Sequence, residues 1–66
     1  ILTHREIEVL QLLAEGKSTK RVAETLSVST KTVETHRLHI MAKLRLYSIA
    51  ELTKYAIRQG ITTIAN

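Results

Sequence analysis

Apolar residues recur along the chain at intervals of three and four, the spacing of one face of an α-helix. They fall between residues 7 and 14, between 22 and 26, between 33 and 44, and from residue 49 to 56. Short polar stretches separate these four groups, which indicates brief connections between helices. We therefore expect no strand and four helices, near residues 4–15, 19–26, 30–44 and 49–59.

Residues that favour helix ends stand at the boundaries of these groups. Thr3 and Glu6 have the spacing of a capping box, in which each side chain accepts the backbone N–H group of the other residue. Ser48 and Glu51 repeat this spacing before the last helix. The two glycines stand where the first and last helices would end, because glycine readily adopts the left-handed conformation of a helix C-cap. The predicted N-caps are Thr3, Ser18, Ser29 and Ser48, and the predicted stops are Gly16 and Gly60, with Ile61 packing back on the core.

The second and third predicted helices have the shape of a helix-turn-helix, a short helix and a longer one joined by a tight turn. Ala23 supplies a small residue where the helices cross, and Val28 and Val33 supply inward apolar side chains. Ser27 occupies a turn position where glycine is common, and a positive φ there would cost serine about 1 kcal/mol relative to glycine. We predict an all-α fold, a four-helix bundle that contains a helix-turn-helix, with residues 1–66 as one domain.

The third helix has two different faces when its residues are placed at ~100° intervals. A leucine on the outer face, between charged residues, is explained if an apolar group such as a thymine methyl contacts it in the major groove of DNA. Single exposed leucines are also common and need no partner. The predicted buried side holds Val33, Ile40 and Leu44, with the stem of Arg37 beside it, and the outer stripe holds Lys31, Thr35, Leu38 and Ala42, flanked by Glu34 and His39.

Positive charge is concentrated in the middle of the chain. Residues 17–46 carry a net charge of +5, whereas residues 1–16 carry −2 and residues 47–66 carry +1. A basic segment indicates a polyanionic partner, although a solvated basic surface explains it equally well. The absence of cysteine excludes disulfides and thiolate metal sites. No apolar run approaches the ~20 residues that span a bilayer, so we expect no membrane segment.

Metal binding, binding of single-stranded nucleic acid and catalysis have little support in the sequence. His36 and His39 stand three residues apart, but no third ligand accompanies them, so we predict no metal site and expect His36 to pack or to cap. Tyr47 and Tyr55 are the only aromatic residues, too few for a sheet that stacks single-stranded bases. The chain has no glycine-rich phosphate loop and no nucleophile with its base. We therefore expect neither an enzyme nor a cofactor.

Several longer motifs cover nearly the whole chain. They are Leu-Thr-x-Arg-Glu-x-Glu-Val-Leu at residues 2–10, Ala-Glu-Gly-x-Ser at 14–18, Thr-Val-Glu-x-His-Arg at 32–37, Ile-Met-Ala-Lys-Leu at 40–44, Glu-Leu at 51–52 and Tyr-Ala-Ile-Arg-x-Gly at 55–60. With these motifs the chain resembles the LuxR-type helix-turn-helix domain, in its NarL/FixJ response-regulator branch. The resemblance implies a four-helix domain that binds double-stranded DNA as a homodimer, with the third helix in the major groove and the fourth helix against its twin.

The resemblance also implies roles for particular residues. Base contacts would fall on Glu34, Thr35 and Leu38, and contacts to the DNA backbone on Ser18, Thr19, Lys20, Lys31, Thr32 and Lys43. Because Ile49, Leu52 and Ala56 are expected to face the core, the twin helix would meet Ala50, Lys54, Ile57 and Arg58. Alternatively, Ile57 closes the core. The chain departs from the family pattern in Thr19-Lys20-Arg21, where many members have Asn-Lys-Glu, and in His39, where asparagine is frequent.

The function that these features predict is sequence-specific binding of double-stranded DNA in the cytoplasm. The chain would be the C-terminal effector domain of a bacterial two-component response regulator, whose N-terminal receiver or sensor domain lies outside it. The first residue is isoleucine rather than methionine, which also indicates a piece of a longer protein. Two alternatives stay open: the DNA-binding domain of a ligand-sensing quorum-type regulator, and a protein-interaction module that uses the fold without DNA.

Overall fold

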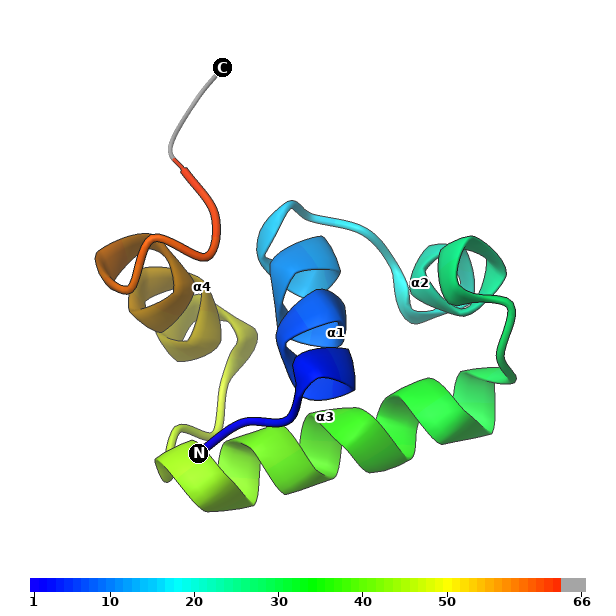
Figure 1. Cartoon of the computed structure of the whole chain (residues 1–66), viewed down its shortest axis with the longest axis horizontal. Helices are drawn as coiled ribbons and strands as arrows, with labels where there is room; N and C mark the ends of the chain where they lie inside the picture. The colour runs from blue at the N-terminus through cyan, green and yellow to red at the C-terminus, as the bar shows by residue number, and fades with distance from the viewer. Residues whose placement is uncertain (64–66) are drawn as a thin grey trace.

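The computed structural model describes residues 1–63, which form four helices joined by short turns (Figure 1). The helices are α1 (His4–Ala14), α2 (Thr19–Leu26), α3 (Thr30–Leu44) and α4 (Ile49–Arg58). No strand occurs in the described part of the chain. The all-α prediction is confirmed, and α1 and α4 each end one residue before the predicted boundary.

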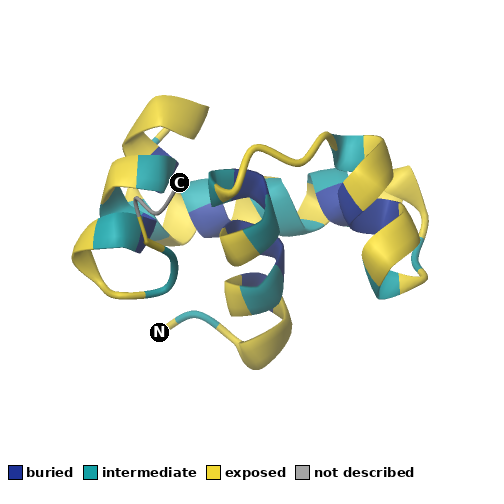
Figure 2. Ribbon diagram, turned by 90° about the horizontal axis from the view of Figure 1, so that it is seen from above, coloured by how far each residue is buried: buried dark blue, intermediate teal, exposed yellow. Residues whose placement is uncertain are grey.

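The first helix is the centre of the packing. In Figure 1, α2 and α4 lie on opposite sides of α1, and α3 runs along the lower edge of the molecule. α1 contacts each of the other three helices, and α2 also packs along α3. The dark blue segments in Figure 2 gather where the helices face one another. All four helices contribute to this core, which consists of Val9, Leu10, Leu13, Val22, Ala23, Val33, Ile40, Leu52 and Ala56.

Two apolar residues that were expected to be buried are more exposed. Ile49 is 42% exposed, so its predicted inward position is wrong. It is the first residue of α4, and the preceding turn, with Tyr47 68% exposed, does not cover it. Leu44, at the end of α3, is only partly buried, although it still packs against the core. Both residues lie at helix ends, where fewer neighbours surround a side chain than in the middle of a helix.

The helix ends use the predicted caps. At the start of α1, Thr3 Oγ1 accepts the N–H of Glu6 at 3.1 Å and Glu6 Oε1 accepts the N–H of Thr3 at 2.9 Å, a complete capping box. The second predicted box is incomplete, because Glu51 Oε1 accepts the N–H of Tyr47 rather than that of Ser48. The other N-caps are Ser18, Ser29 and Ser48, and Gly16 and Gly60 have positive φ after α1 and α4.

The turn of the helix-turn-helix contains the predicted left-handed serine. Ser27 has φ 57° and ψ 44°, and the next residue, Val28, donates its N–H to the carbonyl oxygen of Ala23 at 3.0 Å. The turn is therefore closed by backbone hydrogen bonds, while a residue with a Cβ atom occupies a conformation that favours glycine. Arg45, with φ 55°, ends α3 in the same conformation, which the sequence analysis did not anticipate.

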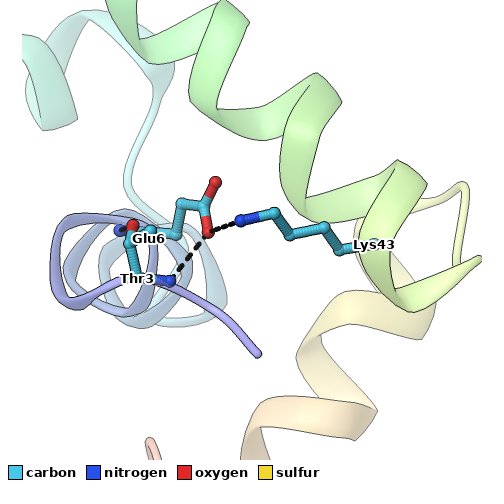
Figure 3. A network of polar contacts seen from close by, with 3 residues as sticks. All are labelled: Thr3, Glu6 and Lys43. Carbon is cyan, nitrogen blue, oxygen red and sulfur yellow. Dashed lines mark hydrogen bonds and ion pairs between the residues drawn. The ribbon is translucent and has the colours of Figure 1, made fainter.

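An ion pair between the buried Glu6 and the partly exposed Lys43 joins α1 to α3 (Figure 3). Glu6 is only 3% exposed, and its Oε1 accepts hydrogen bonds from Lys43 Nζ at 2.8 Å and from the N–H of Thr3. These two hydrogen bonds, above all the one from Lys43, hold the pKa of Glu6 below its ordinary value, although burial acts in the opposite direction. The carboxylate that caps α1 thus also binds the last turn of α3.

We expect Ser27→Gly to raise the free energy of unfolding by about 1 kcal/mol, because glycine adopts the left-handed conformation without the steric cost of a Cβ atom. Urea denaturation followed by far-UV circular dichroism measures the change. Ser27→Ala is the control, since alanine keeps the Cβ atom. An equal gain in both variants would show that the backbone conformation is not the cause.

Removing the partner of Glu6 should destabilise the domain in a pH-dependent way. Lys43→Met leaves a buried carboxylate without its cation, and we expect a loss of about 1–3 kcal/mol at pH 7. The folded-state pKa of Glu6 is lowered, so the contribution of the pair is complete above the ordinary carboxyl pKa and disappears as the pH falls through the folded-state value. Urea denaturation at pH 7 and pH 3 should therefore show a smaller difference in acid.

The control for this prediction is Lys20→Met, which removes an exposed lysine from α2. This change should leave stability nearly unaltered at both pH values, since an exposed charge contributes little. A destabilisation by Lys43→Met that is the same at pH 3 as at pH 7 would contradict the role of the ion pair.

Candidate nucleic-acid interface

One face of α3 has no other helix against it. In Figure 1 this face forms the lower edge of the molecule. Its exposed residues recur at helical spacing, and the leucine among them is 62% exposed. On the opposite side of the helix, Val33 and Ile40 are fully buried. The predicted division of α3 is confirmed, and we call its exposed face the outer stripe, consisting of Lys31, Thr35, Leu38 and Ala42, with the exposed His39 at its flank.

Beside the outer stripe, Glu34 holds the start of α2 against α3. One carboxylate oxygen, Oε1, binds Nη2 of Arg37 one turn further along α3. The other, Oε2, accepts a hydrogen bond from the hydroxyl of Thr19, the first residue of α2, at 3.3 Å. The structure therefore engages the carboxylate of Glu34, a predicted base contact, within the domain. Arg37 is partly covered, as expected, and its Nε is buried without a hydrogen-bond partner.

The three cations of α3 lie in different surroundings. Arg37 is paired with Glu34, and Lys43 is paired with Glu6. Lys31, in the first turn of α3, is exposed, and among residues 1–63 it makes no ion pair. Of the two lysines of α3 predicted to contact the DNA backbone, only Lys31 is thus free of an internal carboxylate.

The other predicted backbone-contact residues lie at the N-termini of α2 and α3. Such helix ends favour anions, because their first N–H groups lack partners within the helix and the helix dipole is positive there. The hydrogen bond between Thr19 and Glu34 brings the start of α2 beside the first half of α3. Arg21, an exposed residue that the sequence analysis did not assign to the site, follows this end. Ser18 and Lys20 are exposed, whereas Thr19 and Thr32 are half-buried.

The predicted dimer surface on α4 is exposed at three of its four residues, and the fourth, Ile57, lies toward the end of α1. Leu52 is buried on the inner side of this helix. Ile57 is half-buried, stands beside a shallow hollow next to the end of α1, and lies outside the core cluster. The remaining members of the predicted surface, Ala50, Lys54 and Arg58, are all exposed.

Residues 1–63 form neither a metal-binding cluster nor a membrane-spanning helix. His36 is half-buried and His39 is exposed, and residues 1–63 contain no group of three or more side chains placed to hold a metal ion. Across the described part of the chain, every helix is too short or too polar to traverse a membrane.

Comparison with known proteins places this architecture in a family. The family model of bacterial regulatory proteins, luxR family, matches residues 1–56. The uncharacterized response regulatory protein YgeK of Escherichia coli K12 is 57% identical over 63 residues, which are 96% of this chain and 43% of YgeK. The oxygen regulatory protein NreC of Staphylococcus carnosus is 52% identical over 61 residues, 92% of this chain and 28% of NreC.

The NreC protein of Staphylococcus aureus JH9 is similar to the same extent, 52% over 61 residues, which are 92% of this chain and 28% of the relative. The chain thus spans less than half the length of these relatives. The family match extends from the start of α1 into α4 and includes the whole helix-turn-helix. The chain therefore belongs to the luxR family of bacterial regulatory proteins.

Proposed function

We propose that this chain is a sequence-specific, double-stranded-DNA-binding effector domain of a bacterial two-component response regulator. The observation that carries the proposal is the outer stripe of α3, an uncovered helix face with the exposed Lys31 at its N-terminal end, in a member of a family of regulatory proteins. A helix of this kind, placed second in a helix-turn-helix, fits the major groove of B-DNA.

In this proposal the N-terminal ends of α2 and α3, together with Lys43 in the last turn of α3, contact the phosphates, and the outer stripe contacts the bases. The backbone contacts are Ser18, Thr19, Lys20, Lys31, Thr32 and Lys43, and the base contacts are Glu34, Thr35 and Leu38. Thr35 and Leu38 are exposed, so their side chains can approach a base without rearrangement. Glu34 and Lys43 would have to share their bonds with Arg37 and Glu6.

The names and lengths of the relatives support a proposal about the longer protein to which this chain belongs. YgeK is described as a response regulatory protein and NreC as an oxygen regulatory protein, and this chain covers 43% and 28% of them. We therefore assign the chain to a longer cytoplasmic regulator that has an N-terminal receiver domain. The name of YgeK favours a response regulator over a ligand-sensing quorum-type protein.

A second part of the proposal is that the domain acts as a homodimer on DNA. One α3 contacts only a few base pairs, too few to single out a site among the ~10⁶ or more competing sites of a genome. Two copies related by a two-fold axis would contact two half-sites about one turn of DNA apart. The pairing surface would be α4, because α1, α2 and α3 already place their apolar faces in the core.

The free domain should nevertheless be a monomer at micromolar concentration. The proposed surface is small, and it carries Lys54 and Arg58, whose charges repel their counterparts across a two-fold axis. In the intact protein, a receiver domain that covers this surface until it is phosphorylated would control the pairing.

The first test is the salt dependence of DNA binding. Lys31→Ala should weaken binding to all duplexes about equally and reduce the slope of log K against log salt by about one, because one phosphate contact is lost. Leu38→Ala should instead change which sequence is preferred, by ~1–3 kcal/mol per lost base contact. Fluorescence anisotropy with several duplexes at four salt concentrations measures both effects.

Arg5→Ala is the control for this test, because Arg5 pairs with Glu8 within α1 and lies outside the proposed interface. Binding that does not weaken with salt would favour the protein-interaction module. A change of sequence preference in Lys31→Ala, with none in Leu38→Ala, would mean that α3 is oriented differently.

The second test concerns α4. Ile57→Asp should abolish cooperative binding to a duplex with two half-sites and leave binding to a single half-site intact, since a carboxylate on the pairing surface would be desolvated. Analytical ultracentrifugation with and without each duplex measures the assembly. Ile7→Asp places the same charge at an isoleucine of α1 that is 37% exposed and serves as the control. Unchanged cooperativity in Ile57→Asp would exclude α4 as the pairing surface.

A further inference from the structure

We infer that this domain recognises its half-site through the C5-methyl groups of pyrimidines, which in ordinary DNA are those of thymine. Leu38 and Thr35 would contact these methyl groups, and hydrogen bonds from α3 to guanine would contribute little. The inference rests on the proposed function, DNA binding through the outer stripe of α3, and adds the chemical class of base that the stripe selects.

The first observation is that the middle of the outer stripe has no free cation. The commonest specific contact in the major groove is a bidentate hydrogen bond from arginine or lysine to guanine O6 and N7. Arg37 is bound to Glu34 and is only about a third exposed, at 32% of its side chain. Lys43 is bound to the buried Glu6 at 2.8 Å. Either residue would have to leave a carboxylate without its cation in order to bind guanine, and the carboxylate of Glu6 is almost inaccessible to solvent.

The remaining free cation of α3 lies at one end of the stripe. Lys31 is in the first turn of the helix, beside the N-terminus, where phosphate is favoured. A lysine at this place binds as a point charge and does not require a particular base. The centre of the stripe, between Lys31 and Lys43, is therefore left to side chains other than lysine and arginine.

The second observation is what the centre of the stripe does present. Leu38 is 62% exposed, and Thr35 and Ala42, one turn before and one turn after it, are exposed as well. Each of the three carries at least one methyl group, and leucine and alanine can neither donate nor accept a hydrogen bond. The C5-methyl group of thymine is the apolar group that a base presents in the major groove. The outer stripe is thus complementary to methyl groups over about two turns of helix.

The size of the effect follows from the apolar surface removed from water. Burying one methyl group changes affinity by about fourfold. With two or three such contacts in each half-site, the affinity for thymine would exceed that for the other bases by enough for mutation and base substitution to measure the difference.

The experiment replaces thymine by deoxyuridine, which lacks only the C5-methyl group and keeps every hydrogen-bonding atom. A preferred duplex is first selected with the chain from a random-sequence pool. Each thymine is then replaced singly, and binding to the wild-type chain and to Leu38→Ala is measured by fluorescence anisotropy. We expect a loss of about fourfold at one or more positions for the wild type, and little further loss at one of those positions for Leu38→Ala.

Two additional arms complete the experiment. One tests whether a C5-methyl group on cytosine also strengthens binding, and the other tests whether hydrogen bonds to guanine matter more than the methyl groups. At the position most sensitive to deoxyuridine, a C·G pair is compared with a 5-methylcytosine·G pair, and the methylated pair should bind more tightly. Each guanine is also replaced by 7-deazaguanine, which removes the N7 acceptor, and these changes should matter less than loss of the methyl groups. Ile7→Ala, which removes an exposed isoleucine outside the stripe, should respond to deoxyuridine as the wild type does.

The outcomes distinguish this inference from the proposed function. Tight, salt-dependent binding to a selected duplex that tolerates deoxyuridine at every position would overturn methyl recognition and leave DNA binding intact. The same conclusion would follow if Leu38→Ala lost as much as the wild type at every position, or if 7-deazaguanine caused the largest losses. Failure to enrich any duplex, or binding independent of salt, would overturn the proposed function itself.

Discussion

The arrangement of the whole domain depends on the contacts of one helix, α1, with the other three. A chain of this size buries only about 60% of the surface that its unfolded form exposes, so it has room for a single core. Val9, Leu10 and Leu13 of α1 lie in that core, and the same helix uses Glu6 to bind Lys43 on α3. The central helix therefore fixes both the spacing and the rotation of α3. If α1 shifted, the surface that α3 presents would shift as well.

The position of α3 is fixed from both ends. At its N-terminal half, Glu34 binds Thr19 of α2, and at its C-terminal end Lys43 binds Glu6 of α1. Two residues in the left-handed conformation, Ser27 and Arg45, redirect the chain before and after the helix. These restraints act on the inner and lateral sides of α3, so none of them requires an atom of the outer stripe.

The local features of this structure could be predicted from the sequence, and the long-range pairs could not. Caps such as Thr3 with Glu6 act over three residues, and the division of α3 into two faces follows from helical periodicity alone. The contact between Glu6 and Lys43 joins residues 37 positions apart, and that between Thr19 and Glu34 joins residues 15 apart. Such pairs depend on how helices cross. The exposure of Ile49 depends likewise on the course of the preceding turn, which no pattern in the sequence determines.

The separation of the two faces of α3 has a consequence for how such domains diversify. Residues that stabilise the fold, such as Val33 and Ile40, are distinct from the exposed residues Thr35, Leu38 and Ala42. Substitutions in the exposed set leave the core intact, since surface changes away from caps and ion pairs usually alter stability by less than about 0.5 kcal/mol. One scaffold can therefore acquire a new target by a few changes without passing through an unfolded ancestor. A protein engineer could use the same freedom to exchange the outer stripe while retaining the rest of the domain.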